Sequence, residues 1–220
     1  MKKLLYLFLT LLIVACSGED NNNDNNPNGG DNTVLVCNGD NPVYLADNGI
    51  TIKACDDANV GDTGVINGIT YTVVDEAMLR EMVENEQDVT KLATTKVTDM
   101  KLMFYENSTF NQPIGNWDVS NVTNMNFMFS NSTFNQPIGN WDVSNVTFMN
   151  FMFYNSTFNQ PIGNWDVSSV TVMALMFAEA ETFNQDLSSW SVDGVTQCLQ
   201  FSDGATSWTL PQPNFTNCTP

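Results

Sequence analysis

The chain has 220 residues, enough for one or two domains, with 25 acidic residues, 7 basic residues and no histidine. Its formal net charge of −18 argues strongly against a nucleic-acid partner, because that binding depends on neutralising phosphates with lysine and arginine. The same charge disfavours electrostatic attachment to anionic lipid. The lack of histidine removes Ser-His and Cys-His catalytic pairs.

Residues 1–15 have the layout of a signal peptide. A short basic start precedes an apolar run over residues 4–14, which is too short to span a bilayer. The sequence Ile-Val-Ala-Cys that ends at Cys16 resembles the lipobox of bacterial lipoproteins. That resemblance implies cleavage before Cys16 and acylation of this cysteine. The alternative is an ordinary signal peptide followed by an incidental cysteine.

Residues 16–32 are expected to be the lipidated cysteine and a disordered tether, because residues 17–32 include no apolar side chain. Residues 17–20, Ser-Gly-Glu-Asp, resemble the acidic surface-export signals of some outer-membrane lipoproteins. We therefore expect a protein anchored by lipid in the bacterial outer membrane and facing the cell exterior. Display on the periplasmic side is the alternative.

Four cysteines remain once Cys16 is lipidated, and an even number in an exported chain indicates two disulfides. Three connectivities are possible. We favour Cys37 with Cys55 and Cys198 with Cys218, because each pair closes a short loop within one module. Without histidine or a CxxC spacing, a zinc site is disfavoured.

Residues 33–87 are expected to form a small module of β-hairpins and a helix that caps the repeats. Asp-Asn-Gly at 47–49 and Asn-Gly at 67–68 are strong hairpin signals between apolar segments. Asp75 suits a helix N-cap, and the apolar residues that follow it at helical spacing predict a helix over about residues 76–85.

Residues 88–205 contain a repeat of 24 residues. Its motif, FNQPIGNWDVSNVT, begins at Phe110, Phe134 and Phe158, with a looser copy at Phe183 and a degenerate first copy over residues 92–100. A fixed period of this length indicates units that stack, since one unit cannot bury its own apolar face. Residues 115–120 suggest a short strand, and Thr123 suggests the N-cap of a short helix. We predict an α/β, leucine-rich-repeat-like solenoid of about five rungs, closed by a C-terminal cap over residues 206–220.

The repeated motif FNQPIGNWDVSNVTNM resembles that of BspA-like leucine-rich-repeat surface lipoproteins. The resemblance extends over about residues 40–218 and includes the stretches PVYLADNGITIKA and GDTGVINGITYTVVDE. It implies display on the cell surface and a role in adhesion or protein binding. It supplies no catalytic residues.

Two repeated columns are candidate functional positions. The first contains Trp117, Trp141 and Trp165. Exposed, these rings would suit sugars, but Leu92 in the same column favours burial. The second contains Asp118, Asp142 and Asp166. A local turn to the serine two residues later is the favoured role of these aspartates; a divalent cation between units and a glycosidase carboxylate pair are the alternatives.

Positions that vary among the copies are the best guide to the outer face. Phe148, Tyr154 and Val172 would form an exposed apolar patch there, which marks a partner site. We therefore predict a monomeric, non-catalytic surface lipoprotein without a cofactor. It would bind an extracellular protein or a neighbouring cell surface through repeated weak contacts. The alternative function is glycan capture by the tryptophan column.

Overall fold

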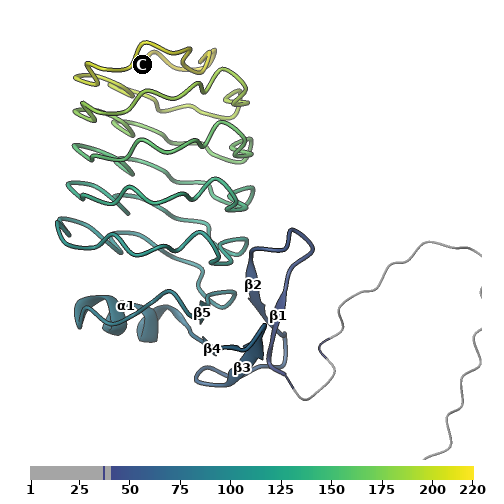
Figure 1. The fold of residues 1–220 in the computed structure, drawn as a ribbon. Coiled ribbons are helices and arrows are strands. Elements are labelled where there is room, and N and C mark those ends of the chain that lie inside the picture. The colour runs from purple at the N-terminus through teal and green to yellow at the C-terminus, as the bar shows by residue number, and fades with distance from the viewer. Residues whose placement is uncertain (1–36, 38–40) are drawn as a thin grey trace, which may run out of the picture. The chain divides into compact units, whose positions relative to one another are not determined.

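A computed structural model describes Cys37 and residues 41–220 (Figure 1). The predicted signal peptide, the lipidated Cys16 and the predicted tether lie outside the described residues. Among the residues that are described, no helix combines the length and apolarity needed to cross a bilayer.

The N-terminal part of the described chain contains two small sheets. Strands β1 (Val43–Leu45) and β2 (Ile52–Ala54) form an antiparallel hairpin, with Val43 opposite Ala54. Strands β3 (Thr63–Ile66) and β4 (Ile69–Val73) form the second hairpin, and β5 (Leu92–Ala93) adds to β4 in parallel. Both hairpins predicted from the turn residues are confirmed.

Helix α1 (Glu76–Glu84) confirms the helix predicted over residues 76–85. The side chain of Asp75 accepts a hydrogen bond from the backbone N–H of Met78 at 2.9 Å, which satisfies one of the free donors at the helix start. Arg80 donates from Nη2 to the carbonyl oxygens of Asp99 (3.3 Å) and Lys101 (3.0 Å). The helix thereby covers the carbonyl edge of the first repeat copy.

The repeat copies stack as successive coils, which lie one above another from teal to yellow in Figure 1. We number them coil 1 (88–109), coil 2 (110–133), coil 3 (134–157), coil 4 (158–182) and coil 5 (183–207). Single parallel β-bridges join equivalent residues of neighbouring coils: Asp99 to Asn124, Asn124 to Phe148, Phe148 to Val172 and Val172 to Gln197.

The predicted leucine-rich-repeat-like α/β solenoid, with a short strand and a short helix in every rung, is wrong. Within the described residues the only helix is α1, and the regular strands are those of the two small sheets. Neither the helix expected from Thr123 nor the strand expected over residues 115–120 is present in the repeats. The coils consist of consecutive turns joined by isolated bridges.

Hydrogen bonding between coils explains the absence of these helices. The backbone N–H groups of Met125, Phe127 and Phe129 each donate to coil 3 at 2.9 Å, whereas that of Met128 donates back to Met125 at 3.2 Å. An α-helix that begins at Thr123 would instead bond the N–H groups of Phe127 and Phe129 to carbonyls of the same segment. Phe127, with φ of 59°, also lies in the left-handed region, which interrupts a right-handed helix.

The interior of the stack consists of columns of identical buried side chains. Phe129 and Phe153 stack with ring centroids 5.7 Å apart, and Trp141 and Trp165 stack at 6.5 Å. Met125 and its equivalents are also buried. Each coil therefore covers the apolar face of its neighbour, as a repeat that cannot fold alone requires.

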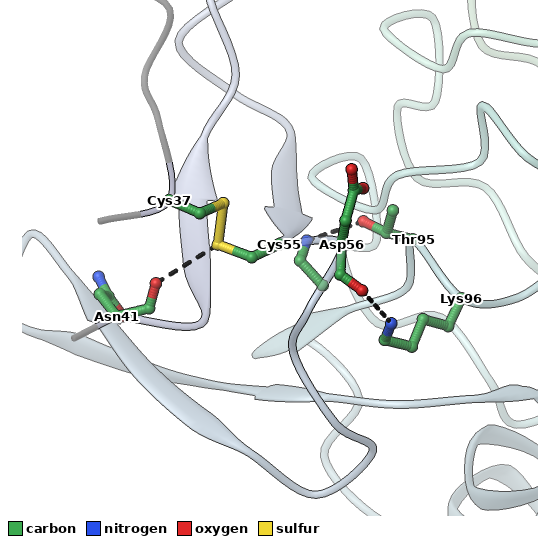
Figure 2. Close-up of a disulfide and its surroundings, with 7 residues drawn as sticks. Cys37, Asn41, Cys55, Asp56, Thr95 and Lys96 are labelled. Carbon is green, nitrogen blue, oxygen red and sulfur yellow. Dashed lines mark hydrogen bonds between the residues drawn. A yellow bond between two sulfur atoms is a disulfide. The ribbon is translucent and has the colours of Figure 1, made fainter. Parts of the chain in front are cut away.

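Both disulfides join the favoured local pairs, Cys37 with Cys55 and Cys198 with Cys218. Figure 2 shows the first of them beside two contacts with coil 1. The N–H of Ala54 donates to Oγ1 of Thr95 at 2.8 Å, and Nζ of Lys96 donates to the carbonyl of Asp56 at 3.4 Å. These contacts attach the first hairpin to the repeats.

The tail after coil 5 continues the stacking. The indole nitrogen of Trp208 donates to the carbonyl of Gln185 at 2.9 Å. The ring of Phe215 packs against that of Phe201, with centroids 4.9 Å apart. The Cα atoms of the disulfide Cys198–Cys218 are 5.9 Å apart. The tail thus covers the apolar interior at the end of the stack.

Candidate protein-binding surface

The tryptophan column lies inside the stack. Trp117, Trp141 and Trp165 are all buried, and each indole N–H donates to a carbonyl of the preceding coil at 2.9–3.2 Å. A buried indole needs such a partner, and this bond fixes the register of neighbouring coils. The interpretation of this column as an exposed aromatic strip for sugars is therefore wrong, and the apolar Leu92 at the same position was the informative residue.

The aspartate column forms the local turns that the Asp-x-Ser pattern predicts. Oδ1 of Asp118 accepts from the N–H and the hydroxyl of Ser120 at 3.2 and 2.7 Å. Asp142 makes the same pair of bonds to Ser144. For Asp166, hydrogen bonds from the hydroxyl and the N–H of the serine two residues later lower the pKa of the carboxyl.

The structure offers no geometric support for a cation between these aspartates. The described residues contain no group of three or more acidic, cysteine or histidine side chains arranged to hold a metal ion. The local turn bonds explain the carboxylates without one. The local turn favoured from the sequence is therefore confirmed for these carboxylates.

Asp118 differs from the equivalent aspartates of the later coils, Asp142 and Asp166, because the first hairpin covers it. It is 2% exposed, and Nζ of Lys53 in β2 lies 3.6 Å from its Oδ1. Its Oδ2 has no hydrogen-bond partner among the described residues, and Asp118 is one of the residues that line a pocket of about 290 Å³. Lys53 thus neutralises a carboxylate that is solvated in the later coils, and the pair marks the junction between hairpin and repeats.

The three variable positions do not form the predicted patch. Phe148 is 42% exposed, and Tyr154 is half-buried and packs edge-on against Phe151 with centroids 5.6 Å apart. Val172, by contrast, is only 8% exposed. It lies in the bridge column between Phe148 and Gln197, where its short branched side chain is buried. The inclusion of Val172 was wrong.

Another set of apolar side chains, which shares Tyr154 with the predicted patch, forms a line of exposed and half-buried residues along one face. We name it the outer ladder; its members are Leu102, Tyr105, Phe127, Phe151, Tyr154 and Leu175. Leu102 and Tyr105 are 43% and 41% exposed. The rings of Phe127 and Phe151 stack 4.5 Å apart at 8°, and the Tyr105 ring meets that of Phe127 edge-on at 6.3 Å.

Sequence reasoning identified only Tyr154 of the outer ladder, because it took positions that vary among the copies as the guide to the outer face. Phe127 is the same in the first two full copies, so it was not among the candidates. The available signal was its recurrence as Phe151 and Leu175 at 24-residue intervals, outside the columns assigned to the core. Recognising that signal required the knowledge that the repeat copies consist of turns and contain no helix.

A groove adjoins the coil 1 end of the outer ladder. It has a volume of about 300 Å³, and its walls come from the end of α1 and from coil 1. Leu102 and Tyr105 provide apolar lining, while Glu84 and Glu86 provide acidic groups. Arg80 also borders the groove, but its charge is paired with Glu76 at 2.9 Å.

A family model described as "Mycoplasma protein of unknown function, DUF285" matches residues 75–157 and again residues 155–217. These two segments together span well over half of the chain. The chain belongs to the DUF285 family. The double match agrees with the internal repeat. No curated protein and no solved structure matches this DUF285 chain.

The DUF285 segments contain the whole outer ladder and leave out both hairpins. They begin at Asp75, the N-cap of α1, and reach residue 217, next to the last disulfide. Helix, coils and tail therefore coincide with the family match. From residue 102 to residue 220 this DUF285 chain carries nine acidic residues and no lysine or arginine, so the ladder lies on an acidic part of the molecule.

Proposed function

We propose that this chain is a BspA-like lipoprotein, anchored through Cys16 in the bacterial outer membrane. It displays its coils outside the cell and binds an extracellular protein or a neighbouring cell surface, without catalysis. The lipobox-like sequence and the repeated motif support the anchoring and the family resemblance. The outer ladder is the observation that supports binding, because it places apolar side chains on the surface of successive coils.

Repetition is what makes such a surface useful. One half-exposed aromatic side chain contributes about 1–2 kcal/mol when a partner covers it. Association of two proteins costs at least roughly 4 kcal/mol in lost translational and rotational freedom. A single coil therefore binds too weakly, whereas side chains from four neighbouring coils together exceed this cost. Binding through many similar contacts is the mode that near-identical coils favour.

Glycan capture is not the better proposal, because the tryptophans that suggested it are buried. The aspartates that suggested hydrolysis are occupied by turns. Both alternatives depended on side chains that serve the fold. The half-exposed aromatic rings of the outer ladder, in contrast, are available to a partner.

Photo-crosslinking on whole cells tests the proposal. The full chain is expressed with p-benzoylphenylalanine in place of Phe151, a substitution that retains an aromatic ring. The control carries the same group in place of Ser169, which is exposed and lies outside the ladder. We expect a crosslinked extracellular protein from position 151 only. Its absence at both positions, with surface display verified by external protease, would refute the proposed binding.

The anchor is tested separately by Cys16→Ala. We expect this change to abolish metabolic labelling with a fatty-acid analogue and to release the protein from the membrane fraction. An unchanged membrane fraction would show that another segment holds the protein.

A further inference from the structure

We infer that the outer ladder docks a basic amphipathic helix of a partner protein. This inference rests on the binding function proposed above and specifies its partner. Three independent observations support it: the backbone conformation at the ladder, the spacing of its side chains, and the charge around it.

The backbone conformation shows that the fold itself does not require apolar bulk at these positions. Leu102, Phe127, Phe151 and Leu175 all have φ between 53° and 61°. This left-handed region is unfavourable for a bulky side chain and is best occupied by glycine or asparagine. The second left-handed column of the coils follows that preference in three of five coils, with Asn131, Asn155 and Gly204, and contains glutamate in the other two.

Gln200 in coil 5 confirms that the ladder column tolerates a polar residue. It has the same left-handed φ, 53°, and it is exposed. The backbone therefore does not impose phenylalanine and leucine in the earlier coils, which leaves partner binding as a second role beside the stacking of Phe127 on Phe151. Residues held in an unfavourable conformation on an exposed surface are typical of binding sites.

The spacing of the ladder suits an α-helix. Coils joined by parallel bridges are about 4.8 Å apart. A helix that lies along the stack presents one apolar side chain per turn, every 5.4 Å. The spacing of the coils and the pitch of the helix differ by about 0.6 Å per step, and the difference adds up to about 2 Å over four coils. Side chains at i, i+4, i+7 and i+11 of a partner helix therefore meet the successive ladder residues.

The charge of the surface around the outer ladder determines which side chains suit the polar face of the partner helix. The coils that carry the ladder from Leu102 onward have no lysine or arginine, and nine acidic residues lie between there and residue 220. Glu106 and Glu179 are exposed in the left-handed column four residues after the ladder column. At the coil 1 end, Glu84 and Glu86 border the groove beside Leu102. A partner rich in lysine and arginine complements this surface, and an acidic one is repelled.

Peptide binding to the full chain tests the inference, with fluorescence anisotropy as the readout. The probes are 18-residue helical peptides: one with leucines on one face and lysines on the other, one with glutamates replacing the lysines, and one with the lysine peptide scrambled. We expect saturable binding of the lysine peptide alone, with Kd on the order of micromolar near 0.1 M salt. Equal binding of the scrambled or the glutamate peptide would overturn the inference.

Substitutions in the protein separate binding from folding. The double variant Phe127→Asn/Phe151→Asn should weaken binding at least tenfold. Its unfolding temperature should change by no more than about 3 °C, because asparagine suits the left-handed backbone and offsets the lost ring stacking. The control Val60→Asn removes a side chain that is 44% exposed in the N-terminal module and should not affect binding. Unchanged binding in the double variant would overturn the inference.

The outcomes also distinguish this inference from the broader function. A crosslinked partner at position 151 together with failure of the lysine peptide would refute the basic helix but retain protein binding. Lys101→Glu gives a further check, because this exposed residue precedes the ladder at coil 1. Its charge reversal should tighten binding of the lysine peptide, and a weaker affinity would contradict the electrostatic argument.

Discussion

Gly139→Ala tests the close approach of neighbouring coils. A Cβ at this position would lie 2.8 Å from the backbone carbonyl oxygen of Pro161 in the next coil. Favourable carbon contacts begin near 3.5 Å, so the coils must separate by several tenths of an ångström. The obstacle is backbone of the same stack, which cannot rotate away as a flexible side chain would.

Overpacking of this kind typically costs about 1–3 kcal/mol. For a chain of this size, each kcal/mol lowers the unfolding temperature by about 2–4 °C. We therefore expect Gly139→Ala to lower it by roughly 2–12 °C. Since each coil contacts only its neighbours, the loss should be concentrated at the junction of coils 3 and 4.

Differential scanning calorimetry of the full chain measures the change, and Gly194→Ala is the matched control. The Cβ of that variant would meet its nearest backbone oxygen at 3.2 Å, a much milder contact. Equal unfolding temperatures for Gly139→Ala and the control would refute the close approach. A loss of protection from hydrogen exchange that is spread evenly over all coils would refute the nearest-neighbour argument.

Three further predictions concern the charged and covalent links. Lys53→Met should destabilise the chain by about 1–3 kcal/mol in urea unfolding, because it leaves the buried carboxylate of Asp118 without a counter-charge, and adding Asp118→Asn should recover most of the loss. The pKa of Asp166 is lowered in the folded state, so its contribution to stability is present above the unfolded pKa of about 3.9 and is lost as the pH falls through the folded value. An NMR titration should give a midpoint below that of a free aspartate, and an ordinary midpoint would contradict the turn bonds. Replacing Cys198 and Cys218 by serine opens a link across 20 residues and should cost about 3 kcal/mol, with faster hydrogen exchange confined to the tail and coil 5; loss of protection in the hairpins would contradict a local role.

Local signals in the sequence were sufficient where the chain forms independent elements. The Asn-Gly turn at 67–68 and the N-cap at Asp75 predicted a hairpin and a helix that the structure contains. The same holds for the local disulfides and for the Asp-Ser turns of the repeats. These features depend on residues close together in the chain, and the local chemistry determines them.

The candidate surface was less predictable because exposure depends on neighbouring coils. Phe148 and Val172 belong to one column, yet only the larger side chain extends to the surface. Phe127 has the apolar character of a core residue, and its left-handed backbone turns it to the outer face. Neither outcome can be read from residue type and spacing alone.

By itself, the sequence determined that identical units must stack, and it favoured burial of the tryptophan column. It could not determine how each unit is built, because apolar residues three apart suit both a helical turn and a series of tight turns. The tertiary structure decided in favour of turns. Alternate N–H groups find carbonyl partners in the adjacent coil, so the bonds that an isolated helix would form are made between coils. The exposed line of Leu102, Phe127, Phe151 and Leu175 is a consequence of that choice.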